Sequence, residues 1–147
     1  MSEKLPVDIA KAFVEAYAKK DWAGLWALSD WRIVLDEIPT RRKTHGIKRF
    51  MTIMQEWGAS FPDSKIEIKD MSDYGKTASF ILKWTGTHEG PIDTPGGTIF
   101  PTGKKIDVPV TMTVDVGEEG TVESVTHLFD MALMEKQIEL RPEERVA

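Results

Sequence analysis

The stretch that decides the fold is residues 108–116, Val-Pro-Val-Thr-Met-Thr-Val-Asp-Val. Large apolar side chains stand at every even position, and successive side chains of a β-strand point to opposite faces of its sheet. The other face carries Thr111, Thr113 and Asp115. A strand with one buried and one hydrated face is typical of antiparallel sheets, so we expect helices to cover the apolar face.

The same period of two recurs on both sides of this stretch. It predicts three further strands, at residues 66–68, 78–84 and 122–129. Turn signals separate the four strands: Asp73-Tyr-Gly75, Pro101-Thr-Gly103 and Gly117-Glu-Glu-Gly120. Connections this short favour antiparallel hairpins over βαβ units. An apolar run at residues 31–36 predicts another strand earlier in the chain.

Helical periodicity dominates the first third of the chain. Four helices are expected in all: residues 6–19, a short one capped by Asp21, residues 47–57, and one from Met131 to about Leu140. Pro6 suits the first turn of the first helix, and the second places Trp22, Leu25 and Trp26 on one face. Helices followed by an antiparallel sheet predict a single α+β domain over residues 1–147.

Composition excludes several classes of protein. Of the 147 residues, 41% are hydrophobic and 29% are charged, values close to those of soluble globular proteins. No apolar run reaches the roughly 18 residues of a membrane span, and the start lacks a signal-peptide core, so we expect a cytoplasmic protein. The absence of cysteine excludes disulfides, thiolate nucleophiles and cysteine-based metal sites.

Charge and histidine placement argue against nucleic-acid and metal partners. The net charge is −5 with both signs interspersed, whereas nucleic-acid binders concentrate Lys and Arg on one face. The basic run at residues 41–43 is interpreted as a solvated loop leading into a helix. Three histidines are scattered, none at helical i, i+4 spacing, so no metal site is predicted. Gly103-Lys104 lacks the other residues of a phosphate-binding loop.

Four short motifs follow one another between Phe61 and Gln137. In order they are Phe61-Pro62-Asp63, Gly86-Thr87-His88-Glu89-Gly90, Pro101-Thr102-Gly103-Lys104, and Asp130 followed by Leu133-Met134-x-x-Gln137. With these motifs, in this order, the chain resembles the SnoaL-like polyketide cyclases. The resemblance covers roughly half of the chain.

The resemblance implies a cone-shaped α+β barrel, as in nuclear transport factors and ketosteroid isomerases. It further implies a deep apolar pocket and a homodimer formed through the outer sheet face. In the cyclases, the aspartate at the Asp130 position acts as acid and base in an intramolecular aldol ring closure without metal or cofactor. We therefore expect no cofactor, and a small apolar organic ligand as partner rather than nucleic acid or a membrane.

The chain departs from the family pattern at three places. The strand facing Asp130 usually carries a polar residue, but here that face includes Met112 and Val114. The segment 91–100 is longer than usual, and its Pro-Gly-Gly predicts a mobile flap over the mouth of the cone. Thr126-His127 stands near where the family usually has a Trp. We therefore expect a pocket whose lining differs from that of the cyclases.

Asp130 and His88 are the candidate catalytic residues. Asp130 lies where a strand gives way to a helix, so it is either a helix cap or a carboxylate whose pKa an apolar pocket raises. His88 either ties a strand end to the neighbouring hairpin or donates a hydrogen bond to a substrate carbonyl. His127 is expected on the outer face, because three residues along a strand separate it from Asp130, unless a bulge intervenes.

Five residues are the candidate pocket lining. They are Tyr17, Trp26, Asp36, Trp84 and Met112. Asp36 ends the first predicted strand, near where ketosteroid isomerases place their base. Tyr17 is interpreted as core packing with its hydroxyl at the rim. The five Trp in the chain, among them Trp31 and Trp57, are interpreted mainly as core and pocket wall that would suit a large flat ligand.

Three functions remain open from the sequence. The first is a cofactor-free cyclase or isomerase that moves a proton on an apolar, carbonyl-bearing molecule through a carboxylate. The second is a protein that only binds an apolar ligand. The third, ranked last, is an epoxide hydrolase, whose Asp-Arg-Asp site lacks a suitable arginine after position 49.

Overall fold

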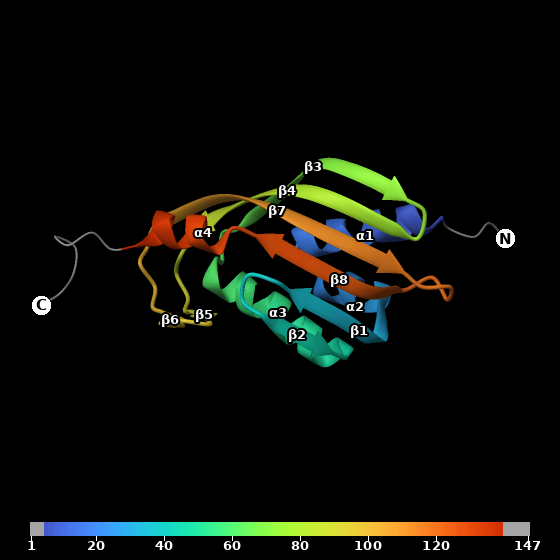
Figure 1. The fold of residues 1–147 in the computed structure, drawn as a ribbon, viewed down its shortest axis with the longest axis horizontal. Helices are drawn as coiled ribbons and strands as arrows, with labels where there is room; N and C mark the ends of the chain where they lie inside the picture. The colour runs from blue at the N-terminus through green and yellow to red at the C-terminus, as the bar shows by residue number, and fades with distance from the viewer. Residues whose placement is uncertain (1–4, 140–147) are drawn as a thin grey trace, which may run out of the picture.

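The computed structural model describes residues 5–139, whose arrangement is shown in Figure 1. The helices are α1 (Pro6–Ala18), α2 (Trp22–Leu28), α3 (Ile47–Ser60) and α4 (Met131–Ile138). The strands are β1 (Ser29–Glu37), β2 (Arg42–His45), β3 (Lys65–Tyr74), β4 (Thr77–Thr87), β5 (Ile92–Thr94), β6 (Gly97–Ile99), β7 (Lys105–Val116) and β8 (Val122–Phe129). The predicted α+β class is confirmed.

Six strands form one curved, open sheet in the order β2-β1-β8-β7-β4-β3. Every neighbouring pair is antiparallel except β1 and β8, which are parallel. The expectation of a wholly antiparallel sheet was therefore wrong for this pair. Short turns predict only how consecutive strands pair, whereas β1 reaches β8 through the long crossover that a parallel pair requires.

The apolar face of β7 lies in the core, as its alternation predicts. Val108, Val110, Met112, Val114 and Val116 are all buried, while the Thr and Asp side chains between them are partly exposed. Helix α1 packs across β3, β4 and β7, and α3 packs against β1 and β2. Helices α1 and α3 thus cover one face of the sheet, and the core lies between these helices and that face.

The structure gives three segments a more definite form than the sequence predicted. The basic run at 41–43 is not a solvated loop throughout, because Arg42 opens strand β2. The segment 91–100 forms the separate hairpin β5–β6, and Ile92 anchors it by being buried. Helix α4 ends at Ile138 in the structure, and Leu140 lies outside the described residues. Within residues 5–139, no helix is long and apolar enough to cross a membrane.

Candidate functional site

A buried carboxylate, Glu37, is the centre of the site. Its Oε1 accepts hydrogen bonds from Thr40 Oγ1 (2.5 Å), Arg42 Nη2 (2.7 Å) and Arg42 Nε (3.0 Å). Its Oε2 accepts one from Trp57 Nε1 (2.7 Å) and one from His127 Nδ1 (3.3 Å). We refer to these five residues as the Glu37 cluster. Both carboxylate oxygens are thereby saturated with donors, as a fully buried charge requires.

Strand register explains why these side chains meet. On β1 the inward positions are Ile33, Leu35 and Glu37, so the carboxylate occupies the last position of the apolar face. Glu37 pairs with Arg42 on β2 and with His127 on β8, which aligns the three in one row across the sheet. The two remaining donors come from the β1–β2 turn and from α3, which covers this row.

The charges of the cluster determine where the shared proton lies. Burial acts to raise the pKa of Glu37, but the hydrogen bond and the charge of His127, the hydrogen bond from Thr40 and the charge of Arg42 outweigh it and lower the pKa to about 2. Glu37 is therefore ionised at neutral pH, and the proton of the contact with His127 belongs to Nδ1. In the neutral ring Nε2 then carries the free lone pair. That atom is buried and has no hydrogen-bond partner among the described residues.

Aromatic rings enclose His127. Phe129 lies 5.2 Å from it between ring centroids, and Tyr17 meets it edge-on at 6.4 Å. Burial and the charge of Glu37 raise the pKa of Tyr17, so its hydroxyl stays protonated. Four rings pack against one another between α3 and the sheet, and we call them the aromatic cluster: Trp57, Phe61, Trp84 and Phe129. This cluster fills much of the space in which the resemblance implied a deep pocket.

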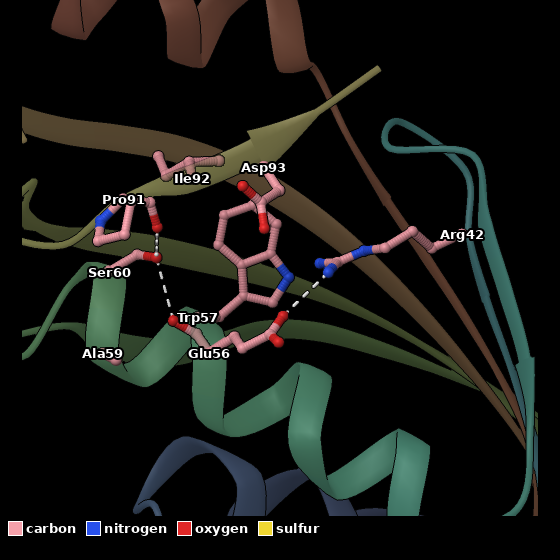
Figure 2. A pocket seen from close by; sticks show the side chains of 8 residues that line it. All are labelled: Arg42, Glu56, Trp57, Ala59, Ser60, Pro91, Ile92 and Asp93. Carbon is pink, nitrogen blue, oxygen red and sulfur yellow. Dashed lines mark hydrogen bonds and ion pairs between the residues drawn. The ribbon is translucent and has the colours of Figure 1, made fainter. Parts of the chain in front are cut away.

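A hollow of about 230 Å³ lies on the outer side of Trp57 (Figure 2). It is bounded by β2, the C-terminal part of α3 and the start of β5, and its lining is Arg42, Glu56, Trp57, Ala59, Ser60, Pro91, Ile92 and Asp93. The Trp57 ring lines this hollow while its N–H binds Glu37. Trp57 therefore separates the hollow from the carboxylate. Arg42 reaches both sides, since its Nη1 also donates to Glu56 Oε2 at 3.0 Å.

Asp130 caps a helix, and His127 lies on the face opposite to the one predicted. Asp130 is exposed at the N-cap of α4, where its Oδ1 accepts a hydrogen bond from Leu133 N at 3.0 Å. The helix-cap interpretation is thus confirmed, and a catalytic role for Asp130 stays a prediction. The expectation that His127 faces outward was wrong, because it shares the inward face of β8 with Val125 and Phe129. Asp130 follows the end of that strand, so it does not set the strand's phase.

His88 ties the end of β4 to the loop between β6 and β7. Its Nδ1 lies 3.0 Å from Thr102 Oγ1 and accepts a hydrogen bond from Thr102 N, and its backbone N–H donates to the Lys104 carbonyl. Burial lowers the pKa of His88, and a hydrogen bond to the Gly90 backbone opposes this effect. The structural interpretation of this histidine is confirmed, and its role as a substrate donor stays a prediction.

The predicted pocket residues divide into two groups. Tyr17, Trp84 and Met112 are buried in the interior around the aromatic cluster. Trp26 is exposed on α2, and Asp36 is only partly buried because its side chain alternates with those of Leu35 and Glu37. The structure does not bring these two to the site. Trp31, predicted as core, is exposed and lies under the Arg32 guanidinium.

Sequence reasoning missed Glu37 and Arg42. A signal for Glu37 was present, since it continues the alternation of Ile33 and Leu35 and is therefore an acidic residue in an apolar phase. Arg42 gave no such signal, because it stands within a run of basic residues. Within residues 5–139, no group of three or more His, Asp or Glu side chains is placed to hold a metal ion.

Comparisons with known proteins agree with this fold. The profile of the SnoaL-like polyketide cyclase family matches residues 7–138. A candidate SnoaL-like polyketide cyclase from Jannaschia sp. CCS1 superimposes with a TM-score of 0.79 at 14% identity, covering 97% of this chain and 99% of the other. An NTF2-like protein from Burkholderia thailandensis E264 gives 0.78 at 16%, covering 94% and 100%. AclR of Streptomyces galilaeus, described as a candidate hydroxylase, gives 0.73 at 17%, covering 90% and 94%. No curated protein matches the sequence significantly.

Proposed function

Since this chain belongs to the SnoaL-like polyketide cyclase family, we propose that it is a cyclase or isomerase that moves a proton on an apolar, carbonyl-bearing small molecule. The observation that carries the proposal is the buried Glu37–His127 pair. In the neutral ring, Glu37 fixes the proton of His127 on Nδ1, and Nε2 is then a base without a hydrogen-bond partner among the described residues. A carboxylate that orients a histidine in this way also stabilises the imidazolium that forms when the ring accepts a proton.

The proposed reaction begins with removal of the proton next to a substrate carbonyl. Nε2 of His127 takes this proton, and the electron pair of the broken C–H bond forms an enolate. In a cyclisation the enolate carbon attacks a second carbonyl of the same molecule, and the imidazolium returns its proton to the new alkoxide. In an isomerisation the proton returns to a different carbon. Glu37 remains ionised throughout, because its pKa of about 2 is far below neutral pH.

Trp57 controls access in this proposal. It closes the path from the hollow to Glu37, and His127 lies behind the same ring system. We expect the substrate to enter the hollow and the Trp57 side chain to turn away, releasing its hydrogen bond to Glu37. The tight packing of the aromatic cluster keeps water from the interior until then.

The proposal can be tested without knowing the natural substrate. Aryl ketones and cyclic 1,3-diketones are incubated with the protein in D2O, and proton NMR follows deuterium incorporation next to the carbonyl. We expect protein-dependent exchange that falls at least 100-fold in His127→Gln and in Glu37→Gln. Glu118→Gln is the matched control, since Glu118 is 88% exposed in the β7–β8 turn. Exchange that survives both cluster substitutions contradicts the proposal.

Asp130→Asn distinguishes the two candidate bases. Asp130 is exposed and already caps a helix, whereas His127 Nε2 is buried without a partner among the described residues, so we favour His127. Loss of exchange in Asp130→Asn, with exchange retained in His127→Gln, would assign the reaction to Asp130. Circular dichroism of both variants shows whether the fold is intact.

The rival function is ligand binding without catalysis. It is favoured by the complete burial of His127 behind the aromatic cluster. A panel compound that quenches Trp fluorescence at micromolar concentration, yet exchanges no faster than in buffer, would support this rival. His127→Gln should then bind the same compound unchanged.

We also propose that the chain forms a homodimer through the outer sheet face, as the resemblance implies. Ile81, Thr111 and Leu128 are in register on that face, and both aliphatic side chains are exposed. Light scattering should give the mass of two chains. Ile81→Lys together with Leu128→Lys should give the mass of one, while a single-chain mass for the unmodified protein contradicts the dimer.

A further inference from the structure

We propose that Glu56 occupies the place of an acidic ligand oxygen on Arg42, so that the hollow binds flat apolar molecules carrying one carboxylate, phenolate or enolate oxygen. The inference rests on the proposed function in one respect, that the hollow is where the substrate enters. All other support for the inference comes from the contacts around Arg42.

Arg42 presents a fixed donor edge to the hollow. Its Nε and Nη2 both bind Glu37 Oε1, and its guanidinium carbon lies 5.8 Å from the centre of the Trp57 ring. Because a guanidinium is planar, these contacts fix the direction of the remaining nitrogen. Nη1 is therefore held at the edge of the hollow, as Figure 2 shows. An oxyanion placed there meets a donor that needs no reorganisation.

Glu56 is bound to this donor weakly enough to leave it. Among the described residues the carboxylate makes one contact, 3.0 Å to Nη1, and its side chain is 52% exposed against 25% for Arg42. Ion pairs between such side chains contribute little to stability because water competes for both charges. Glu37 differs, since it is buried and binds the same guanidinium through two nitrogens. A ligand can thus replace Glu56 without disturbing the cluster.

Replacing the Glu56 carboxylate by a ligand oxyanion also keeps the positive charge of Arg42 balanced. Arg42 keeps the same number of negative partners when Glu56 swings into water and a ligand oxygen takes its place. A neutral ligand oxygen gains less, because it must displace a charged one. Asp93 accepts a hydrogen bond from Thr98 Oγ1 and remains exposed nearby, so a second negative charge on the ligand would be repelled. One acidic oxygen is therefore the expected number.

The remaining lining selects an apolar body. The Trp57 ring, Pro91 and Ile92 are flat or aliphatic surfaces. The polar group of Ser60 is already used, since its hydroxyl lies 2.7 Å from the Pro91 carbonyl and donates there or to the Glu56 carbonyl. An enolate oxygen bound at Arg42 Nη1 would be stabilised by a cation that its contacts with Glu37 hold in place.

The test compares 2-naphthoate with its neutral analogue 2-naphthamide, using Trp fluorescence and calorimetry. The variants are Glu56→Gln, which keeps the side-chain shape, and Glu118→Gln as a matched control that also removes one exposed carboxylate. We expect Glu56→Gln to tighten naphthoate about two- to fivefold, corresponding to the loss of a weak competing pair. Naphthamide affinity should change less than twofold, and the control should leave both affinities unchanged.

Two outcomes overturn the inference: equal tightening of both probes, or naphthoate affinity that Glu56→Gln leaves unchanged. Arg42→Lys provides the second measurement, since Lys keeps the charge that Glu37 needs but loses the fixed edge. Naphthoate should weaken at least tenfold in it, with folding checked by circular dichroism. These readouts need no turnover. If naphthoate affinity changes as expected but no deuterium exchange is found, the proposed enzyme activity is contradicted and the anion site is still supported.

Discussion

Glu37→Gln should remove most of the acid sensitivity that the buried cluster gives to the fold. Gln has the shape of a protonated glutamic acid, so the variant approximates the protein with Glu37 neutralised. The pKa of Glu37 falls from 4.5 to about 2 on folding, although burial alone acts to raise it, because His127, Thr40 and Arg42 favour the charged form. The folded state therefore gains from the charge.

The size of this gain follows from the two pKa values. One pKa unit corresponds to about 1.4 kcal/mol, so the difference between 4.5 and about 2 corresponds to about 3 kcal/mol of unfolding free energy. Because the folded pKa is the lower one, the contribution is complete above about pH 5. It is lost progressively as the pH falls from about 5 to about 2. At neutral pH the variant should be about 3 kcal/mol less stable.

Urea unfolding at several values between pH 7 and pH 2.5, followed by circular dichroism, checks this. The gap between the unmodified protein and Glu37→Gln should narrow as the pH falls. Asp30, Asp63 and Glu67 also have lowered pKa values, but both proteins retain them, so they cancel in the difference. A gap below 1 kcal/mol at pH 7, or one that stays constant with pH, would refute the reasoning.

Three further substitutions test individual contacts by urea unfolding. Trp57→Phe keeps a ring but removes the N–H that binds Glu37, and should cost about 1–2 kcal/mol; an unchanged midpoint would contradict the contact. Gly90→Ala places a Cβ 2.5 Å from a backbone carbonyl of α3 and should cost about 1–3 kcal/mol, whereas Gly96→Ala, which meets nothing closer than 3.8 Å, should cost less. Asp130→Ala removes the α4 cap and should cost about 1 kcal/mol, with Asp130→Asn largely retaining stability.

Local periodicity was enough to predict the main elements of the fold. The alternation at residues 108–116 gave the correct buried face of β7, and the apolar stripe after Pro6 gave α1 with its proline in the first turn. The parallel contact between β1 and β8 could not be predicted in this way. It depends on which sheet edge remains free once the hairpins have formed, and no local pattern records that.

The site was harder to predict because each of its members looks ordinary in its own neighbourhood. The strand prediction followed the apolar run and stopped at Asp36, one residue short of Glu37. His127 was assigned to the wrong face by counting back from Asp130, which stands outside the strand. The role of Arg42 depends on its contact with Glu37. The pairing register of β1 and β2 places these two residues opposite each other.

The parallel pairing of β1 with β8 also has a consequence for how the protein is made. Glu37 on β1 and His127 on β8 are 90 residues apart in the sequence. Strand β8 is the last strand of the sheet to leave the ribosome. Until β8 arrives, β1 has no neighbour on that side, and the Glu37 carboxylate can stay hydrated. Contacts this distant in sequence slow folding, because a large loop must close before they contribute. The contact between Glu37 and His127 therefore forms in the same late event that completes the core.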